Sequence, residues 1–146
     1  VMLQPIDNVK YEFFSLKEIS QWGILAKKDD PFSSGKVITK EDIRTMPLIM
    51  HQRIGLQNEI AHWAEMDVED LNIAATYNVV HGSPISFVQQ GLGYFLTTRE
   101  MLAPELDPEV CFLPLEPQRP TRQALVWKKH AVFSKAAEIF KSIIIE

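Results

Sequence analysis

Polar side chains that can bind a small molecule follow three short apolar runs of the sequence. They are Met50-His51-Gln52-Arg53, Thr76-Tyr77-Asn78 and Thr97-Thr98. Arg53 can form two parallel hydrogen bonds with one carboxylate, and a helix that begins near Asn78 would add free backbone N–H groups and a partial positive charge. The pattern predicts a reversible site for a small molecule, with a carboxylate as the best match. The alternative is that each residue only caps a helix or solvates a loop.

The sequence offers little support for catalysis. His81-Gly82-Ser83 places a hydroxyl near an imidazole, but Ser83 lacks the flanking G-x-S-x-G pattern of a nucleophile, and a helix cap explains it better. Gly91-Leu92-Gly93 has Leu96 where a dinucleotide-binding turn has its third glycine. It also follows a helix and precedes a strand, which is the reverse of that turn. We predict no catalytic residues and expect that the chain is not an enzyme.

The residues that commonly bind metals do not form a metal site in the sequence. His51, His62, His81 and His130 lack the spacing of metal ligands. Cys111 lies in an apolar run and is predicted to be a small buried thiol. We therefore predict no metal and no cofactor. A single cysteine cannot form an internal disulfide and no signal peptide is recognisable, so a cytoplasmic location is expected.

The composition limits the class of partner. The chain has 146 residues, is 46% hydrophobic and carries a net charge of −4, with a sequence pI near 5.6. Its size and apolar content suit a globular body. No basic run exceeds a Lys-Lys pair, so strong DNA binding by this chain alone is not predicted. No apolar span is long enough to predict a membrane partner.

Two stretches in the first half of the chain predict helices. Thr39-Lys40-Glu41-Asp42 resembles a capping box, with Asp in place of Glu or Gln, and predicts a short helix over residues 40–45. In the second stretch, four apolar residues recur at spacings that make one face of a helix. They are Leu56, Ile60, Trp63 and Ala64.

Two more helices are predicted in the second half. Asn78 or Ser83 is expected to cap the first of them. Gly91 suits the left-handed residue that ends this helix, and Gly93 lets a backbone approach its neighbour closely. Ser134 is expected to cap the last helix. Its predicted buried stripe consists of Ala137, Phe140, Ile143 and Ile144.

Short apolar runs between these helices predict strands. Trp22–Ala26 and Ala124–Trp127 both end in Lys-Lys pairs and are predicted to be partners in a sheet. Strands that alternate with helices favour an α/β fold with a largely parallel sheet. Ligands in such folds bind at the carboxyl ends of strands, so the three polar groups should converge on one crevice. The other predicted strands are 1–3, 11–14, 48–50, 72–75, 94–96 and 110–113.

A family resemblance connects these pieces. The effector-binding domain of LysR-type transcriptional regulators is similar to an ordered set of segments in this chain: WGILAKKDDPFSSGKVITKEDI, PLIMHQRIGL, NIAATYNVVHGSPISFVQQGLGYFL, CFLPLEP, ALVWKK and VFSKAAEIFKSI. The match runs from Val1 to Ile143. Its strongest pieces are the charged residues before Pro31, the helix start at Thr39, and the helix that leads into Gly91-Leu92-Gly93. Their order and spacing together carry the resemblance.

The resemblance implies a two-lobed fold similar to that of periplasmic solute-binding proteins. It has mixed, mostly parallel sheets and a small-molecule cleft between lobes that two crossing strands join. Residues 25–124 match the second lobe, and residues 1–24 and 125–146 match part of the first. The first strand and helix units of the first lobe are absent from the match. We therefore expect an N-terminally truncated domain whose incomplete first lobe exposes apolar surface and favours self-association.

The resemblance also implies a function. In such regulators a winged helix-turn-helix, absent from this chain, reads DNA, and effector binding changes how a dimer or tetramer sits on it. We expect an effector-sensing and oligomerisation module that works by a ligand-induced conformational shift. The alternatives are a free-standing solute-binding domain of a transport system and a small hydrolytic enzyme. The effector contacts implied by the family fall on Gln52, Arg53, Thr76, Tyr77, Asn78 and Thr97.

Overall fold

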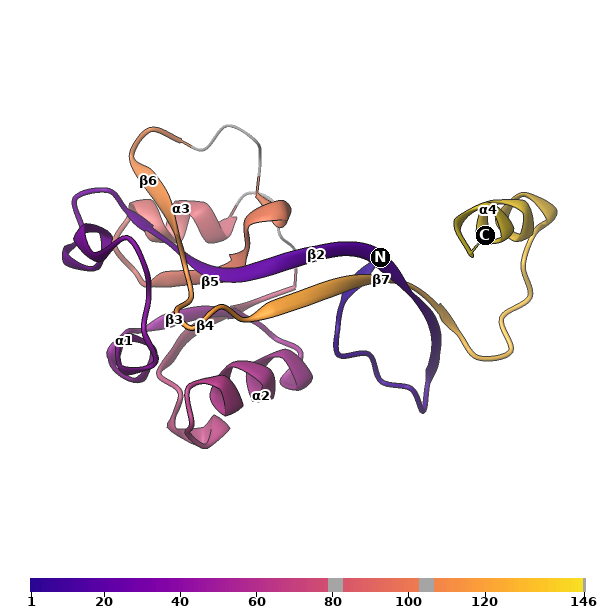
Figure 1. The fold of residues 1–146 in the computed structure, drawn as a ribbon, viewed down its shortest axis with the longest axis horizontal. Helices are drawn as coiled ribbons and strands as arrows, with labels where there is room; N and C mark the ends of the chain where they lie inside the picture. The colour runs from indigo at the N-terminus through magenta and orange to yellow at the C-terminus, as the bar shows by residue number, and fades with distance from the viewer. Residues whose placement is uncertain (79–82, 103–106, 146) are drawn as a thin grey trace. The chain divides into compact units, whose positions relative to one another are not determined.

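The chain forms two compact units, each of which is described by itself. The larger unit is Ile19–Thr121, and the smaller unit combines Val1–Glu18 with Arg122–Glu146. Two long strands, β2 (Tyr11–Lys27) and β7 (Pro120–Lys128), contribute residues to both units (Figure 1). The computed structural model describes residues 1–78, 83–102 and 107–145.

The larger unit is built on a mixed sheet. Besides the inner half of β2, its strands are β3 (Leu48–His51), β4 (Ile73–Tyr77), β5 (Tyr94–Thr98) and β6 (Val110–Pro114). β3 lies between β5 and β4 and runs parallel to both. β2 pairs antiparallel with β5 and with β6. Strands and helices alternate along this unit, so the predicted α/β class is confirmed.

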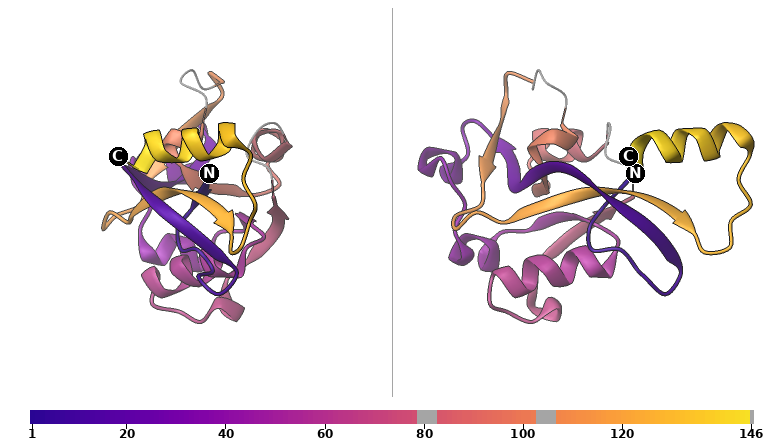
Figure 2. Two further views of the ribbon diagram at one scale, coloured as in Figure 1. Left: turned by 90° about the vertical axis from the view of Figure 1, so that its right-hand side faces the viewer. Right: turned by 45° about the vertical axis from the view of Figure 1, so that its right-hand side comes forward.

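Helices cover both faces of this sheet. Figures 1 and 2 show α3 on one face and α2 on the other. The α-helices of the larger unit are α1 (Lys40–Thr45), α2 (Ile54–Trp63) and α3 (Ser83–Gln89). Its short 3-10 helices are η1 (Pro31–Gly35), η2 (Val68–Asp70) and η3 (Arg99–Met101). None of the helices in the described ranges has the length and apolar character needed to cross a lipid bilayer.

Local signals in the sequence set the start of α1 and the buried face of α2. The Thr39 backbone N–H donates to Asp42 Oδ2 at 2.8 Å, and the Asp42 N–H donates to Thr39 Oγ1 at 3.3 Å. This is the predicted capping box, and it confirms the helix over residues 40–45. On α2 and the residue after it, the predicted apolar face is also confirmed, because Leu56, Ile60, Trp63 and Ala64 are all buried.

Two glycines after α3 allow β5 to enter the sheet. Gly91 has a φ of 73°, the left-handed conformation that was predicted for it. A Cβ on Gly93 would lie 3.0 Å from Ile49 Cγ1 and from the Pro47 carbonyl oxygen, so the predicted close approach is confirmed too. The core on this side of the sheet includes Leu25, Ile49, Val88 and Phe95.

The strands that contain Trp22–Ala26 and Ala124–Trp127 are neighbours in the sheet, as predicted, because β7 lies next to β2, but these two runs do not lie opposite each other. On one edge of β2, residues Gly23–Lys27 pair with β6. On the other edge, residues Trp22–Leu25 pair with β5. β7 lies beside β2 near its start, where the Lys129 N–H donates to the Lys10 carbonyl at 3.1 Å. The Lys-Lys pairs mark where each strand meets solvent, and this carries no information about register.

The smaller unit holds β1 (Met2–Leu3), the outer halves of β2 and β7, and α4 (Lys135–Ile145). Met2 pairs with Ala124 in an antiparallel ladder. Ser134 Oγ accepts the Ala137 N–H at 3.3 Å, which confirms the predicted cap.

The predicted buried stripe of α4 is wrong. Phe140 is 55% exposed and Ile143 is 65% exposed, and no residue of this helix is buried. The helical spacing was recognised correctly, but burial needs a second layer. In the described part of the smaller unit, the buried apolar residues are only Leu3 and Ala124.

Candidate functional site

Three parallel strands of the larger unit end at the same edge of the sheet. His51 at the end of β3 pairs with Tyr77 at the end of β4, and Ile49 pairs with Phe95 of β5. Because β5, β3 and β4 are parallel neighbours, their carboxyl ends lie together, and this is the edge at which ligands bind in such sheets. We call it the carboxyl edge.

Tyr77 forms one wall of the carboxyl edge. Its hydroxyl donates to the Leu96 carbonyl at 3.0 Å, and its ring makes edge contacts with His51 and Phe95, at centroid distances of 5.4 and 4.8 Å. Burial raises the pKa of Tyr77 above its ordinary value, although a hydrogen bond with the Thr97 side chain opposes this shift. Tyr77 is therefore a neutral phenol whose ring is fixed between β3 and β5.

His51 lies beside Tyr77 and is held as a neutral imidazole. Its Nδ1 accepts the backbone N–H of Arg53 at 3.1 Å, which places the ring proton on Nε2. Burial lowers the pKa of His51, and the nearby charge of Arg53 lowers it further. His51 can thus offer one N–H donor to a ligand without adding a charge.

Gln52 and Arg53 connect β3 to α2. The Gln52 backbone N–H donates to the Tyr77 carbonyl at 2.8 Å, so this residue extends the pairing of β3 with β4 while it is exposed to solvent. Arg53 is the N-cap residue of α2, with an extended backbone and no side-chain cap. Its guanidinium charge and the positive pole of the helix dipole lie at the same end of α2, so both favour an anion there.

Strand alternation divides the predicted residues between the two faces of the sheet. Thr97 is 1% exposed and hydrogen bonds with the Tyr77 side chain, so these two residues share a face. Thr76 precedes Tyr77 in β4, is exposed and pairs with Met50 on the opposite face. The structure therefore brings Tyr77 and Thr97 together and leaves Thr76 apart from them.

Asn78 follows β4 directly and is exposed. The prediction that Asn78 or Ser83 caps α3 depends on residues 79–82 and on the side chains of residues 83–84, and it lies outside the described residues. Asn78 therefore enters the site only by its position after the last residue of β4.

Two residues outside the predicted effector contacts also shape the carboxyl edge. His51 belongs to one of the predicted polar groups but is not among those predicted contacts. Gln57 is 8% exposed on the inner face of α2, and its Nε2 donates to the His51 carbonyl at 3.0 Å. A polar residue between Leu56 and Ile60 on an apolar helix face was the available signal for it.

One buried polar atom at this edge lacks a partner. Thr98 ends β5, is 0% exposed, and its Oγ1 has no hydrogen-bond partner in the described part of the chain. An unsatisfied buried hydroxyl costs about 1–3 kcal/mol. Buried polar groups in native structures nearly always bond to a protein group or to an ordered water, so this hydroxyl is an exception. The carboxyl edge thus holds neutral donors and acceptors, a cation and one spare hydroxyl, which are the elements of a binding site.

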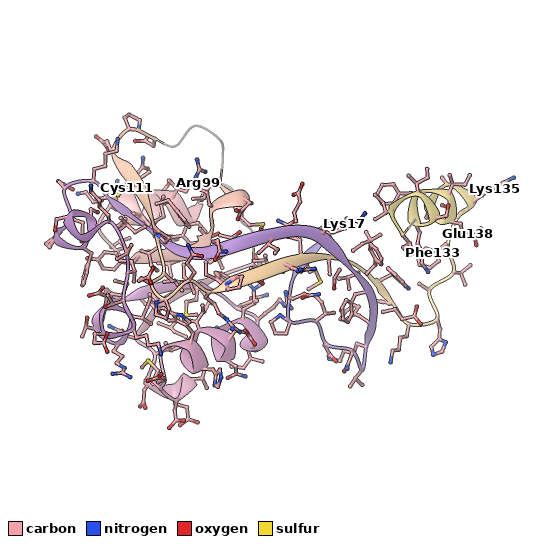
Figure 3. All side chains as sticks on the ribbon, in the orientation of Figure 1. Lys17, Arg99, Cys111, Phe133, Lys135 and Glu138 are labelled. Carbon is pink, nitrogen blue, oxygen red and sulfur yellow. The ribbon has the colours of Figure 1, made fainter. Side chains whose placement is uncertain are left out.

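Cys111 lies outside the carboxyl edge, and the described residues form no metal site. Cys111 is partly exposed and not buried as predicted, and its Sγ contacts Ser33 Oγ at 3.4 Å (Figure 3). Across residues 1–78, 83–102 and 107–145, no three His, Cys, Asp or Glu side chains lie where they could hold one metal ion.

Comparison with known families identifies the domain. The family model described as the LysR substrate-binding domain matches residues 6–146. The chain belongs to this family. Its members are regulatory domains of LysR-type transcriptional regulators, so the family resemblance inferred from the sequence is confirmed, together with the periplasmic-binding-protein-like fold. No curated protein sequence matches the chain.

Solved structures of LysR-family proteins share this fold. The regulatory domain of CcmR from Synechocystis PCC6803, solved in complex with 2-PG, has a TM-score of 0.69 at 15% identity, with 99% of this chain and 70% of that chain covered. HinK from Pseudomonas aeruginosa has a TM-score of 0.67 at 18% identity, covering 97% and 50%. OxyR from Corynebacterium glutamicum has a TM-score of 0.68 at 14% identity, covering 99% and 46%. The chain thus spans about half the length of HinK and of OxyR.

Proposed function

We propose that this LysR substrate-binding domain senses a small-molecule effector at the carboxyl edge of its larger unit and does no chemistry on it. The observation that carries the proposal is the convergence of three parallel strand ends with the uncapped amino end of α2. Such an edge is where α/β sheets bind ligands. The residues proposed to contact the effector are Gln52, Arg53, Thr76, Tyr77, Asn78 and Thr97, to which we add His51 and Thr98.

The chemistry of this edge favours a small carboxylate. Arg53 supplies a forked cation and α2 supplies the positive end of a helix dipole. His51 is a neutral N–H donor and Thr98 Oγ1 is an unpaired hydroxyl, so both suit the uncharged polar groups of such a molecule. None of these groups is an activated nucleophile or an acid–base pair, so we propose binding without turnover.

We further propose how the domain acts within a regulator. Residues 25–124 would form the second lobe, and residues 1–24 and 125–146 would belong to the first. Effector binding would favour one arrangement of the domain over another. A homodimer or homotetramer would transmit this to DNA in the cytoplasm through a helix-turn-helix domain that lies outside this chain. The family membership and the LysR-type regulators with the same fold support this proposal.

The test is a calorimetric titration of the chain with a panel of small mono- and dicarboxylates, followed by an assay of DNA binding. A carboxylate that binds the chain should change the DNA affinity of a regulator containing it, because coupling between two sites is reciprocal. Binding without an effect on DNA would instead favour a solute-binding domain. Conversion of the bound carboxylate to a product would contradict the proposal and favour an enzyme.

A further inference from the structure

A small cavity lies at the amino edge of the sheet in the larger unit, where the parallel strands begin. Tyr94 is the first residue of β5 and pairs with Leu48, the first residue of β3. β2 runs antiparallel to β5 and ends at this edge with Lys27. The cavity has a volume of about 190 Å³, and its lining includes Lys27, Asp30, Gly91 and Tyr94. We call it the amino-edge cavity.

The amino-edge cavity is separate from the proposed effector site. Tyr94 and Thr98 are the first and last residues of β5, which has five residues. At about 3.3 Å per residue, their Cα atoms lie roughly 13 Å apart. The described residues that line the cavity include none of the proposed effector contacts. A molecule bound here would therefore be a second ligand, and the inference does not depend on the proposed function.

One wall of the cavity carries a carboxylate whose direction is fixed by two hydrogen bonds. The Tyr94 hydroxyl donates to Asp30 Oδ2 at 2.7 Å, and the Phe32 backbone N–H donates to Asp30 Oδ1 at 2.9 Å. Burial raises the pKa of Tyr94 to about 12, and the hydrogen bond and charge of Asp30 add to this shift, so Tyr94 is a neutral donor. A carboxylate can accept about four hydrogen bonds, so Asp30 can also accept from an ammonium group.

Lys27 brings the opposite charge to the same cavity. Its Nζ lies 4.0 Å from Asp29 Oδ1, and the Asp29 side chain is 81% exposed, so this ion pair is weak. Among the described residues, no ion pair within 4.0 Å joins Lys27 to Asp30. The cavity therefore contains a cation and an anion that do not pair with each other.

The shape of the cavity favours a very small ligand. Gly91 leaves its side of the cavity open, because nothing lies within 4 Å of where a Cβ would be. Pro47 and Val88 add apolar lining. At about 30 Å³ for each water molecule, the cavity has the space of roughly six waters. A molecule with few non-hydrogen atoms fits this space, and one with a bulky side chain does not.

We propose that the amino-edge cavity binds a small α-amino acid as its zwitterion, with the ammonium group on Asp30 and the carboxylate on Lys27. One such molecule supplies a partner to both charged walls. A simple carboxylate would leave Asp30 without a cation, and a simple amine would leave Lys27 without an anion. Glycine and alanine are the amino acids whose size suits the cavity.

The experiment titrates the ¹⁵N-labelled chain with glycine and follows its backbone amide signals by nuclear magnetic resonance. We expect saturable shifts at the amides of Lys27, Gly91 and Tyr94. Acetate and methylamine each carry only one of the two charges, so each should bind at these amides about ten-fold more weakly or worse. If neither glycine nor alanine shifts these amides saturably, the proposal is wrong. Saturable shifts confined to the carboxyl edge would also contradict it and would assign the amino acid to the proposed effector site.

Two variants test the charged walls one at a time. Lys27→Met removes the ammonium group and keeps an unbranched side chain. Asp30→Asn removes the negative charge and keeps an oxygen for the Phe32 N–H. Each should weaken glycine binding by about ten-fold or more. Lys28→Met is the matched control, because Lys28 is the exposed neighbour of Lys27 and does not line the cavity, so it should bind glycine like the wild type.

The amide spectrum of each variant also reports whether it is folded. If Asp30→Asn loses its dispersed amide signals, Lys27→Met alone decides, because Lys27 lies at the end of β2 and its ammonium makes only the weak Asp29 pair. Glycine that binds a folded Lys27→Met chain as tightly as the wild type would overturn the proposal. Equal weakening by Lys28→Met would overturn it too, since the loss would then follow from net charge and not from the cavity.

Discussion

Arg53 is the residue that we propose attracts an anion to the carboxyl edge. Its charge lies where the dipole of α2 is already positive. We predict that Arg53→Ala weakens a bound carboxylate by about 1.5–3 kcal/mol, or roughly ten- to a hundred-fold in Kd, because charge-assisted hydrogen bonds are lost. Isothermal titration calorimetry measures this directly.

The controls for Arg53 keep its charge or move the substitution elsewhere. Arg53→Lys should recover part of the affinity, since the charge remains but the planar fork is gone. Arg122→Ala, in the smaller unit, should leave the affinity unchanged. If Arg53→Ala binds as tightly as the wild type, Arg53 does not contact the carboxylate.

His51 should make the larger unit sensitive to mild acid. Burial lowers its pKa in the folded chain below the ordinary 6.5, so between 6.5 and that lower value the unfolded chain binds a proton that the folded chain does not. Stability must therefore be lost as the pH falls through this window, and it is fully present above it. Protonation would also remove the Nδ1 acceptor that holds the Arg53 N–H.

The measurement for His51 is the melting temperature between pH 7 and pH 5, where the ordinary histidine pKa of about 6.5 is crossed. We predict a smaller acid-induced fall for His51→Asn, because the amide oxygen replaces the acceptor and does not titrate. Parallel curves for the two chains would show that other groups carry the acid sensitivity.

At the scale of elements, the turn between α3 and β5 depends on one backbone conformation. Gly91 has a φ of 73° and has nothing within 4 Å of where a Cβ would lie, so a substitution there is penalised by conformation alone. We predict that Gly91→Val lowers the free energy of unfolding by about 1–3 kcal/mol, since a β-branched residue resists positive φ. Urea denaturation measures this change.

Gly35 provides the matched control for Gly91. A Cβ there also meets nothing within 4 Å, and its φ lies outside the left-handed range. Gly35→Val should therefore change the free energy of unfolding by no more than about 0.5 kcal/mol. If both variants lose the same stability, the loss comes from the valine side chain and not from the conformation of Gly91.

The elements that sequence could predict are those with local causes. The Thr39 capping box and the Gly91 turn need only neighbouring residues, and both were found. The 17-residue length of β2 was missed, because its two halves pair with different strands far away in the sequence. The exposure of Phe140 was missed for the same reason, since burial depends on a layer that no helical spacing specifies.

For the candidate site, the sequence predicted the edge of the sheet but not which side chains share a face there. Parallel strand order predicted that polar tails would meet at one edge, and the structure places them there. Which side chains share a face depends on where each strand ends. Thr76 and Tyr77 were predicted to follow β4, but they lie within it and so point to opposite faces. Gln57 was missed because its role, a bond to the His51 carbonyl, is a long-range contact.

At the scale of the whole molecule, the two units should differ in local stability. The larger unit has a continuous core, while α4 has no buried residue. We predict that backbone amides of α4 exchange with deuterium far faster than those of β3, because local opening costs little where few contacts are lost. Hydrogen-exchange mass spectrometry measures both. Equal protection of α4 and β3 would contradict this prediction.

The strand order of the larger unit also constrains how this fold can form while the chain is being synthesised. β5 lies between β2 and β3, although it is synthesised after both of them and after β4. Until β5 has emerged, the hydrophobic runs of β2 and β3 lack their common neighbour, and residues 28–93, which lie between β2 and β5, must be translated first. A nascent chain that pauses before β5 would therefore expose the hydrophobic runs of β2 and β3 to chaperones. β5 joins these two strands and so completes the sheet.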